Sequence, residues 1–517
     1  MKPRHLIILL VSAILIAQSA HAQPLQGKSF FLPRSQGTNA ALDISGVHPL
    51  LHRYNQKSCY GAFAVSPFVS KSVRANRIAE AFFGTDVLTI SGSQVSNRGQ
   101  EDFLADYFGL SPDFASTVFV NPTIASFQVA FNAYFHFDQW VRGLYSYMKL
   151  PVVYTTWNLR LSEEITDNGI TVPYPPNYMA ETAVFAPATS FIQALAGHQV
   201  FGELAEPLKF SRVCGAQNKT GCAEFQWLVG YDFILRENGH VGFNLRMAAP
   251  TGSRPGAEFM FEPVVGNGKH WQLGCGFDGH VLLWENNGDR ELNLWASATL
   301  DHLFKSKQCR TFDLKCDRFG SRFILLKEFD ADKNYTGRMF PGPNILTLQA
   351  NVSISIEFEF LLMFAYTHNG TVVDIGYNGW VRGNERISLE KCLPSNTYAL
   401  KGIQNVSVAP AILSNETQSN ATLFGNPFAA QAIVADPNPP IFINSALIDI
   451  SSAESPLAIS HKIFTHIGHI WDKKVWKPFV GIGGQIEFEG INTRETRQPL
   501  KPNLSQWGIW LRGGTGF

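Results

Sequence analysis

Hydrophobic and polar residues alternate with a period of two over long segments of the chain. Between positions 350 and 366 one set of alternate residues, from Val352 to Tyr366, is wholly apolar. The other set begins at Asn351 and is largely polar. Successive side chains of a strand point to opposite faces, whereas helical faces repeat every 3.6 residues. The alternation therefore predicts a long strand with one apolar and one polar face.

The same alternation recurs along the chain and predicts about twelve strands. Some neighbouring strands are separated only by a tight turn, such as Asn238-Gly239, which is typical of a hairpin. Pro151 makes the third strand less regular, since proline favours edges and bulges. The predicted strands are residues 59–69, 125–137, 140–159, 225–236, 240–248, 269–284, 290–304, 350–366, 371–382, 459–471, 479–489 and 504–517.

Two kinds of all-β protein show this pattern, a soluble β-sandwich and a transmembrane β-barrel. The apolar faces are rich in Phe, Trp, Tyr and Leu and almost free of charge over about 9–11 residues, which is the length of a tilted membrane strand. Short turns and long connections also alternate along the chain, as expected when the two ends of a barrel face different compartments. Both features favour the barrel.

The last strand ends on an aromatic residue and carries apolar residues at alternate positions before it. These residues are Trp507, Ile509, Leu511 and Phe517. The ending resembles the assembly signal of Gram-negative outer-membrane β-barrel proteins, and the chain is similar to the porin-like members of that group, with no subfamily assigned. The resemblance implies an all-β, transmembrane antiparallel barrel in the cell outer membrane. It also implies contact with outer-membrane lipid and recognition of this strand by the barrel-assembly machinery; it leaves the oligomeric state open.

The first residues of the chain are typical of a secretory signal peptide. Lys2 and Arg4 precede an apolar run of twelve residues, Leu6 to Ala17, which is too short to span a bilayer as a stable helix. Ala20-His21-Ala22 has the small residues of a cleavage site. We therefore expect a signal peptide at 1–22, an N-terminal periplasmic segment at 23–58 and the barrel at 59–517.

Four predicted connections are unusually long, about 70–124, 160–224, 305–349 and 383–458. Loops of this length with apolar residues are expected to fold partly into the lumen or to cap it. Residues Gln100–Gly109 carry an apolar stripe at helical spacing and predict a short helix. A plug inside the lumen and a helix on the outer surface are both compatible with that stripe.

The composition of the chain excludes some classes of function. Lys and Arg together number 42, as do Asp and Glu, so the chain has no basic excess for nucleic acid. Seven cysteines are present, and the close pairs Cys214/Cys222 and Cys309/Cys316 are candidate loop disulfides. Their spacings match neither a zinc ribbon nor a CxxC redox motif. No catalytic residue, cofactor or metal site is expected.

The polar faces of the strands provide the candidate functional residues. A charged lumen requires water or an ion-paired plug, because unpaired buried charges are prohibitively costly. The excess of carboxylates over arginines predicts a weak preference for cations, unless the charges pair with one another and hold a plug. The predicted pore-lining residues are Asp232, Arg236, Arg246, Asp278, Glu291, Asp301, Glu357, Glu359, Asp374, Arg382, Glu487, Glu489 and Arg512.

These features predict a porin-like channel for passive diffusion of small polar solutes. One alternative is a sealed surface-contact barrel with an adhesin-like role. Another is a membrane-embedded hydrolase such as an outer-membrane phospholipase, since His302, His461 and His469 fall on or near outward positions. The interfacial girdles of a barrel also accommodate such rings, and no matching serine can be placed from the sequence.

Overall fold

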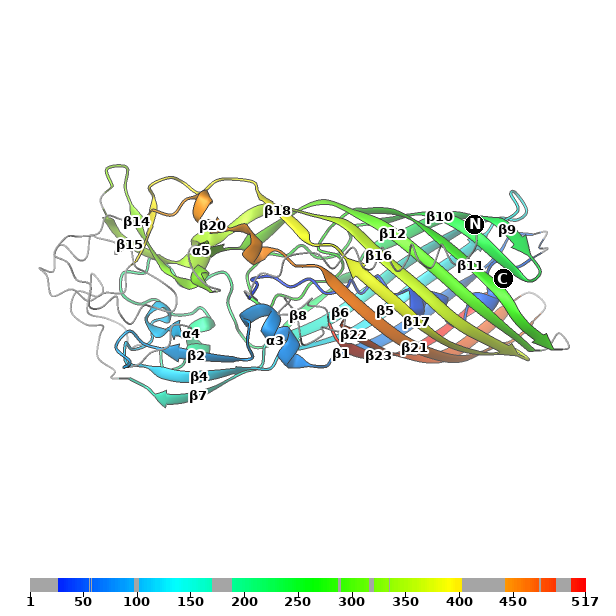
Figure 1. Cartoon of the computed structure of the whole chain (residues 1–517), viewed down its shortest axis with the longest axis horizontal. Coiled ribbons are helices and arrows are strands. Elements are labelled where there is room, and N and C mark those ends of the chain that lie inside the picture. Colours follow the sequence, from blue (N-terminus) through cyan, green and yellow to red (C-terminus); the bar gives the residue numbers. More distant parts are fainter. Residues whose placement is uncertain are drawn as a thin grey trace, which may run out of the picture.

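Twelve antiparallel strands form a closed ring in the computed structural model of the chain (Figure 1). The structure describes residues 27–54, 56, 58–96, 102–169, 188–286, 290–315, 320–333, 335–401, 442–473, 476–489 and 504–517. The ring consists of β1 (Tyr60–Ser72), β5 (Thr123–His136), β6 (Leu144–Asn158), β9 (Phe225–Arg236), β10 (Gly239–Ala249), β11 (Gln272–Asn286), β12 (Arg290–Thr311), β16 (Thr347–His368), β17 (Thr371–Arg382), β21 (Ala458–Ile470), β22 (Lys477–Glu489) and β23 (Gln506–Gly516).

Each ring strand pairs with the next in sequence, and the first strand pairs with the last. Ala62 of β1 lies opposite Gly516 of β23, and the backbone of Gly61 exchanges hydrogen bonds with that of Phe517. Both ends of the barrel segment therefore lie at the end of the barrel that carries the short turns. This closure leaves no free sheet edge, which a strand-based span needs in a bilayer.

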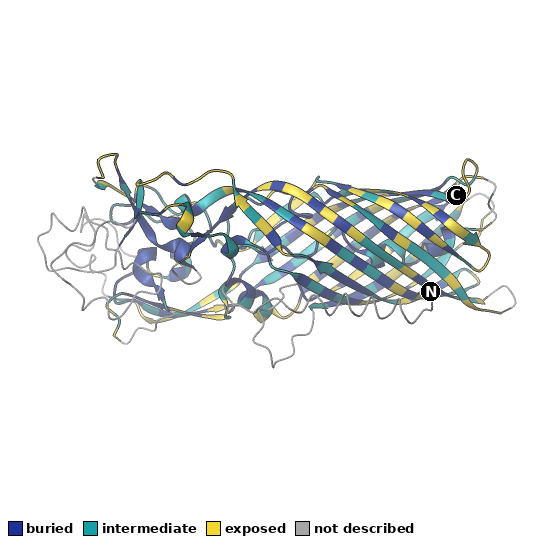
Figure 2. Cartoon of the chain, turned by 45° about the horizontal axis from the view of Figure 1, so that its top comes forward, coloured by how far each residue is buried: buried dark blue, intermediate teal, exposed yellow. Residues whose placement is uncertain are grey.

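The ring strands alternate between apolar residues that face outward and polar residues that face the lumen. In Figure 2 exposed and buried residues alternate along these strands. On β23, Leu511 is 55% exposed while its neighbour Arg512 is 1% exposed. On β17, Ile375 is 57% exposed and Asp374 is fully buried. The wide band of exposed aliphatic and aromatic side chains is the surface that membrane lipid covers in such a barrel.

The twelve predicted strands are all present, with ends that differ by a few residues from those expected. Pro151 lies within β6 in regular pairing, opposite Ala130. The main difference is length, because β12 and β16 each have 22 residues. Their pairing extends to Thr311 and Thr347, beyond the ends expected from the alternation.

The long connections build small sheets beyond one end of the ring (Figure 1). A four-stranded sheet contains β2 (Val87–Ser91), β3 (Phe103–Leu104), β4 (Ala115–Val120) and β7 (Leu161–Asp167). A three-stranded sheet contains β14 (Leu325–Phe329), β15 (Tyr335–Pro341) and β19 (Tyr398–Leu400), and β13 (Asp313–Leu314) pairs with β20 (Ile448–Asp449). Two more strands extend the ring sheet, β8 (Gln217–Cys222) on β6 and β18 (Glu385–Leu389) on β16.

Short helices complete this outer region. They are α3 (Ala75–Phe83), η2 (Ala105–Phe108), α4 (Phe191–Leu195), η3 (Ser321–Phe323), α5 (Gly342–Leu346), η5 (Ser445–Leu447) and η6 (Ile450–Ala453). A large cluster of buried apolar side chains, including Phe114, Ile324 and Leu326, holds the outer sheets and helices together. The described parts of the long connections therefore form an outer cap with its own core. In the part of the chain that the structure describes, no helix has the length and apolarity needed to cross a membrane.

Two local expectations differ from the structure. The helix expected at Gln100–Gly109 is, over its described residues, the short strand β3 followed by the 3-10 turn η2. Its apolar residues still become buried, because Leu104, Tyr107 and Phe108 pack into the core of the outer cap rather than into the lumen. Cys214 and Cys222 are free thiols, with Cys222 paired in β8 against β6; Cys309 is also free, and Cys316 lies outside the described residues.

The N-terminal residues 27–54, which we call the N-terminal plug, begin in the outer cap, where Phe31 and Leu32 join its core, and then occupy the lumen. The plug contains α2 (Ala40–Ile44) and the 3-10 turn η1 (His48–Leu50). That the segment 23–58 is periplasmic stays a prediction; its described residues make hydrogen bonds with inward side chains of β16, β9, β6 and β23. The predicted signal peptide at 1–22 lies outside the described residues.

Candidate functional site

The interface between the plug and the inner wall is the candidate functional site. The guanidinium of Arg34, which lies in the plug, forms ion pairs with Glu359 of β16 and Glu487 of β22. It also donates to Asn378 Oδ1 at 2.8 Å and to the carbonyl of Thr38 at 2.8 Å. Arg34 and both carboxylates are buried, so these contacts neutralise charges that would otherwise be costly inside the barrel.

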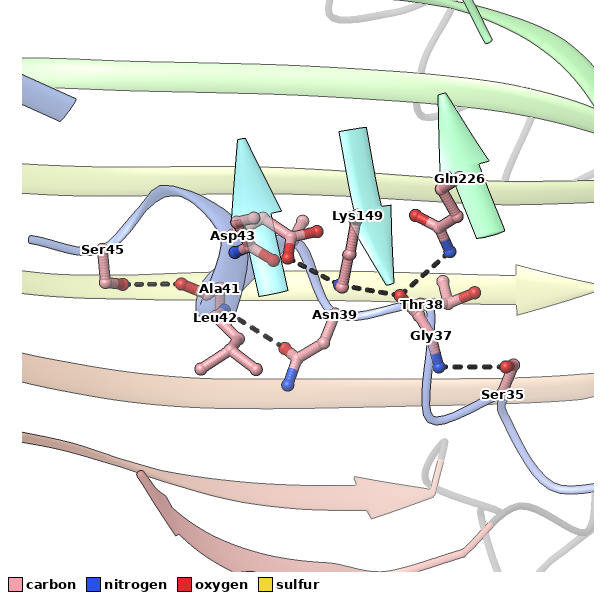
Figure 3. Close-up of polar contacts among 12 residues, drawn as sticks. Ser35, Gly37, Thr38, Asn39, Ala41, Leu42, Asp43, Ser45, Lys149 and Gln226 are labelled. Atoms are coloured by element: carbon pink, nitrogen blue, oxygen red, sulfur yellow. Dashed lines mark hydrogen bonds and ion pairs between the residues drawn. The ribbon is translucent and has the colours of Figure 1, made fainter. Parts of the chain in front are cut away.

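A second set of contacts holds α2 against the other side of the wall (Figure 3). Lys149 of β6 donates to Asp43 Oδ1 at 2.6 Å and to the carbonyl of Gly37 at 2.8 Å. Gln226 of β9 donates to the same carbonyl at 3.0 Å. The side chain of Arg512 donates to backbone carbonyls of α2 and the residue after it, including Ser45 O at 2.8 Å. The plug is thus tied to strands on opposite sides of the ring.

Two groups of histidine and aspartate side chains lie nearer the short-turn end. In the first, His48 of the plug contacts Asp374 Oδ1 at 2.9 Å, and His466 lies 3.3 Å from the other oxygen of that carboxylate. Gly46, with a φ of +74°, brings the plug close to His466. A Cβ at this position would lie 2.2 Å from the His466 ring, so both the backbone and the close approach require glycine.

The second group contains His52 of the plug and three wall residues, Asp232, His240 and Asp278. His52 Nδ1 is 2.7 Å from Asp232 Oδ2, and His240 Nε2 is 3.3 Å from Asp278 Oδ2. His52 Nε2 also lies 3.7 Å from Asp278 Oδ2, so the imidazole stands between two carboxylates.

A cavity of about 150 Å³ remains between the plug and the wall formed by β5, β6 and β9–β12, with β16 on its far side. The plug contributes one wall through Ile44, Leu51 and His52. Aromatic side chains dominate the barrel side of the cavity, with a few charged and hydroxyl groups between them. The barrel-side residues include Tyr134, His136, Tyr145, Tyr147, Asn244, Arg246, Asp278, Trp295, Ser297, Thr299 and Glu359.

The residues predicted to line a pore mostly contact the plug instead of open space. Arg246 lies 3.3 Å from Asp301 across β10 and β12, and Glu489 lies 3.6 Å from Arg77 of α3. Arg236 is exposed near the short turn after β9, and Glu291 is half-buried near the turn before β12. Direct contacts with the plug are made by Asp232, Asp278, Glu357, Glu359, Asp374, Arg382, Glu487 and Arg512.

Sequence reasoning missed the plug partners of these wall residues. Arg34, Asp43, His48 and His52 lie before the first predicted strand, where no alternation marks them as part of the barrel. A usable signal was the surplus of inward carboxylates over inward arginines, since buried charges need counterions. Arg34 supplies one of the missing cations, and His48 and His52 contact the carboxylates of Asp374 and Asp232.

The outward residues singled out from the sequence lie where expected. Trp507, Ile509 and Leu511 are exposed on the outer face of β23, and Phe517 packs on Phe63. His302 contacts the carbonyl of Ser355 at 2.8 Å, His461 contacts the hydroxyl of Tyr377, and His469 contacts Thr371. None of these three rings is hydrogen-bonded to a serine hydroxyl in the described part of the chain, so the geometry gives no support for the hydrolase alternative.

Comparison with known proteins adds no family assignment. No family model matches the chain, and no curated protein matches it. Solved structures with similar folds include an outer membrane channel from Pseudomonas putida F1, with 10% identity and a TM-score of 0.34 over 90% of this chain and 97% of that one. They also include the β domain of the Bordetella autotransporter BrkA, with 7% identity and a TM-score of 0.29 over 88% of this chain and 98% of that one. A third is a mutant of the TodX monoaromatic hydrocarbon channel, with 8% identity and a TM-score of 0.33 over 94% of this chain and 95% of that one.

Likenesses this distant carry no functional argument, so the classification depends on the chain's own geometry. Twelve antiparallel strands close on themselves, their outward face is a band of apolar side chains, and their inward face is polar and charged. Such a surface is stable only when lipid covers it. The chain is a transmembrane β-barrel with a plugged lumen.

Proposed function

We propose that the protein is an outer-membrane channel for small polar solutes, with a preference for those that carry an aromatic ring. The observation that carries the proposal is the cavity of about 150 Å³ beside the plug. Its tyrosines and Trp295 offer apolar ring faces, while Arg246, Asp278 and Thr299 offer polar groups at fixed positions. Binding pockets for small organic molecules combine these two features.

In this proposal, the plug controls passage. The buried ion pairs of Arg34 and Lys149 hold it across the middle of the lumen, so a solute that reaches the cavity crosses only when the plug shifts. Passage requires no chemistry and no bound cofactor. The weak cation preference expected from the wall charges is not part of the proposal, because most of those carboxylates pair with the plug.

Liposome swelling tests the proposal, with phenylalanine and arabinose as solutes that cross lipid slowly. We expect both solutes to enter and phenylalanine to enter faster. Thr299 faces the cavity, whereas the residue directly before it on the strand, Ala298, faces outward. Thr299→Trp should fill the cavity and slow swelling several-fold. Ala298→Trp is the matched control on the same strand and should leave swelling unchanged.

The sealed surface-contact barrel predicts a different outcome. The wild-type protein would then be folded, as shown by a heat-modifiable band on a gel, yet would give no swelling and no conductance in a planar bilayer. Equal rates for Thr299→Trp and the wild type would also contradict the proposal, because the route would then lie elsewhere.

A further inference from the structure

The group formed by His52, Asp232, His240 and Asp278 has the composition and spacing of a metal site. Each side chain offers one ligand atom, and the four atoms all lie within 4.8 Å of one another. His52 Nδ1 lies 2.7 Å from Asp232 Oδ2, and His240 Nε2 lies 3.3 Å from Asp278 Oδ2. The other ring nitrogen of His52, Nε2, lies 3.7 Å from Asp278 Oδ2. Ligand atoms around a tetrahedral Zn²⁺ are roughly 3.3 Å apart, given bonds of about 2.0–2.1 Å. Coordination also requires the rings of His52 and His240, which stack almost in parallel with centroids 3.9 Å apart, to tilt so that both ring planes contain the metal.

Hydrogen bonding leaves part of this group unsatisfied. Asp232 is buried, and within the described residues its Oδ1 atom has no hydrogen-bond partner. Buried carboxylate oxygens normally have a partner, so an unpartnered one calls for an explanation such as a bound ion. Gly242 leaves room for this oxygen, since a Cβ there would lie 2.5 Å from it.

The surroundings resemble the outer shell of a metal site. Asp278 directs one oxygen toward the group, while its other oxygen accepts hydrogen bonds from Tyr145 at 2.6 Å and Asn244 at 2.7 Å. His240 directs Nε2 toward Asp278 and contacts the ring of His280 through Nδ1. Metal ligands are typically oriented by such second contacts, which fix the tautomer of a histidine and the rotamer of a carboxylate.

We propose that His52, Asp232, His240 and Asp278 bind a divalent transition metal, with Zn²⁺ the best match, and that the metal fastens the plug to the barrel wall. Two imidazoles and two carboxylates suit Zn²⁺, whereas Ca²⁺ and Mg²⁺ prefer oxygen ligands alone. One ligand comes from the plug and the others from β9, β10 and β11. Binding would neutralise the buried carboxylate of Asp232 and the partly buried one of Asp278, and would link the plug to the wall.

Metal binding can be measured without any transport assay, so its failure and the failure of the proposed channel are distinguishable. The mature protein is purified in detergent without a histidine tag, stripped with a chelator and titrated with Zn²⁺ against a competing indicator. We expect one tightly bound equivalent. Titration with Co²⁺ should give the intense visible absorption of a tetrahedral site.

Variants locate the site. His240→Asn and Asp278→Asn should each weaken Zn²⁺ binding by about 100-fold or more, and Tyr145→Phe by about 10-fold, since outer-shell changes typically cost 10- to 100-fold. His302→Gln is the control, because it removes a histidine from the outer face of the barrel wall, away from the plug, and it should leave the affinity unchanged. A heat-modifiable gel band shows that each variant is folded.

A second measurement uses only the wild-type protein. Zn²⁺ should slow amide hydrogen exchange in the plug peptide that contains His52, and a chelator should reverse the effect. Three results would overturn the proposal: no stoichiometric binding, equal affinity in His240→Asn and the wild type, or no change in exchange when Zn²⁺ is bound.

Discussion

Replacing Arg34 by alanine gives the most direct test of how the plug is held. The change removes one cation from a buried group: Glu359 loses its main counterion, while Glu487 keeps the nearby Lys462 but loses Arg34. The side chains of Arg34, Glu359 and Glu487 are only 3%, 6% and 1% exposed, so water cannot readily replace the lost contacts. Breaking a buried ion pair by removing one partner costs about 3–5 kcal/mol.

That cost acts on the docked plug and much less on the barrel wall, which keeps its strand pairing. At about 1.4 kcal/mol per factor of ten, the equilibrium between docked and displaced plug should shift roughly 10²- to 10⁴-fold. Hydrogen exchange followed by mass spectrometry reads this shift, because the amides of the plug exchange when it opens locally. Exchange in peptides covering residues 31–51 should accelerate by the same factor, and channel conductance should rise.

Arg338→Ala is the control for the loss of an arginine. Its guanidinium pairs with Glu328 in the outer cap and is 57% exposed, so its removal should cost less than about 1 kcal/mol. Exchange in the plug should then match the wild type. If Arg34→Ala also leaves plug exchange unchanged while the protein is folded, the buried ion pairs do not hold the plug and the reasoning fails.

Three further predictions concern the membrane face, assembly and pH. Ile482→Arg, at a 48% exposed site near the centre of β22, should lower the unfolding free energy in lipid by about 2–4 kcal/mol, whereas Val87→Arg in the outer sheet should have little effect in the same urea titration. Phe517→Ala should reduce the amount of folded barrel in outer-membrane fractions, and an unchanged amount would argue against the terminal assembly signal. Burial and the nearby Lys327 lower the pKa of Lys401 to about 7, from the ordinary 10.5. The unfolded chain therefore binds more protons between these values, and the melting temperature should rise from pH 7 to 10 in the wild type but less in Lys401→Met.

The pattern of the chain was sufficient to predict the ring because strand alternation is a local property. A residue such as Ile375 or Leu511 faces lipid whatever the rest of the molecule does, once its strand is part of a barrel. The inward positions of Glu359, Asp374 and Arg512 follow from the same alternation. Their partners do not, since a charged side chain facing the lumen is equally compatible with water, a loop or a plug.

The sequence by itself therefore determined the twelve strands, their two faces and the common end of the first and last strands. Only the tertiary structure decided what fills the lumen. Arg34 and Glu487 are 453 residues apart in the chain, and His52 and Asp232 are 180 apart. Contacts of that range leave no periodic trace in either segment. They arise because a short polar segment placed before the first strand satisfies the buried charges of a wall that is completed only when the last strand closes the ring.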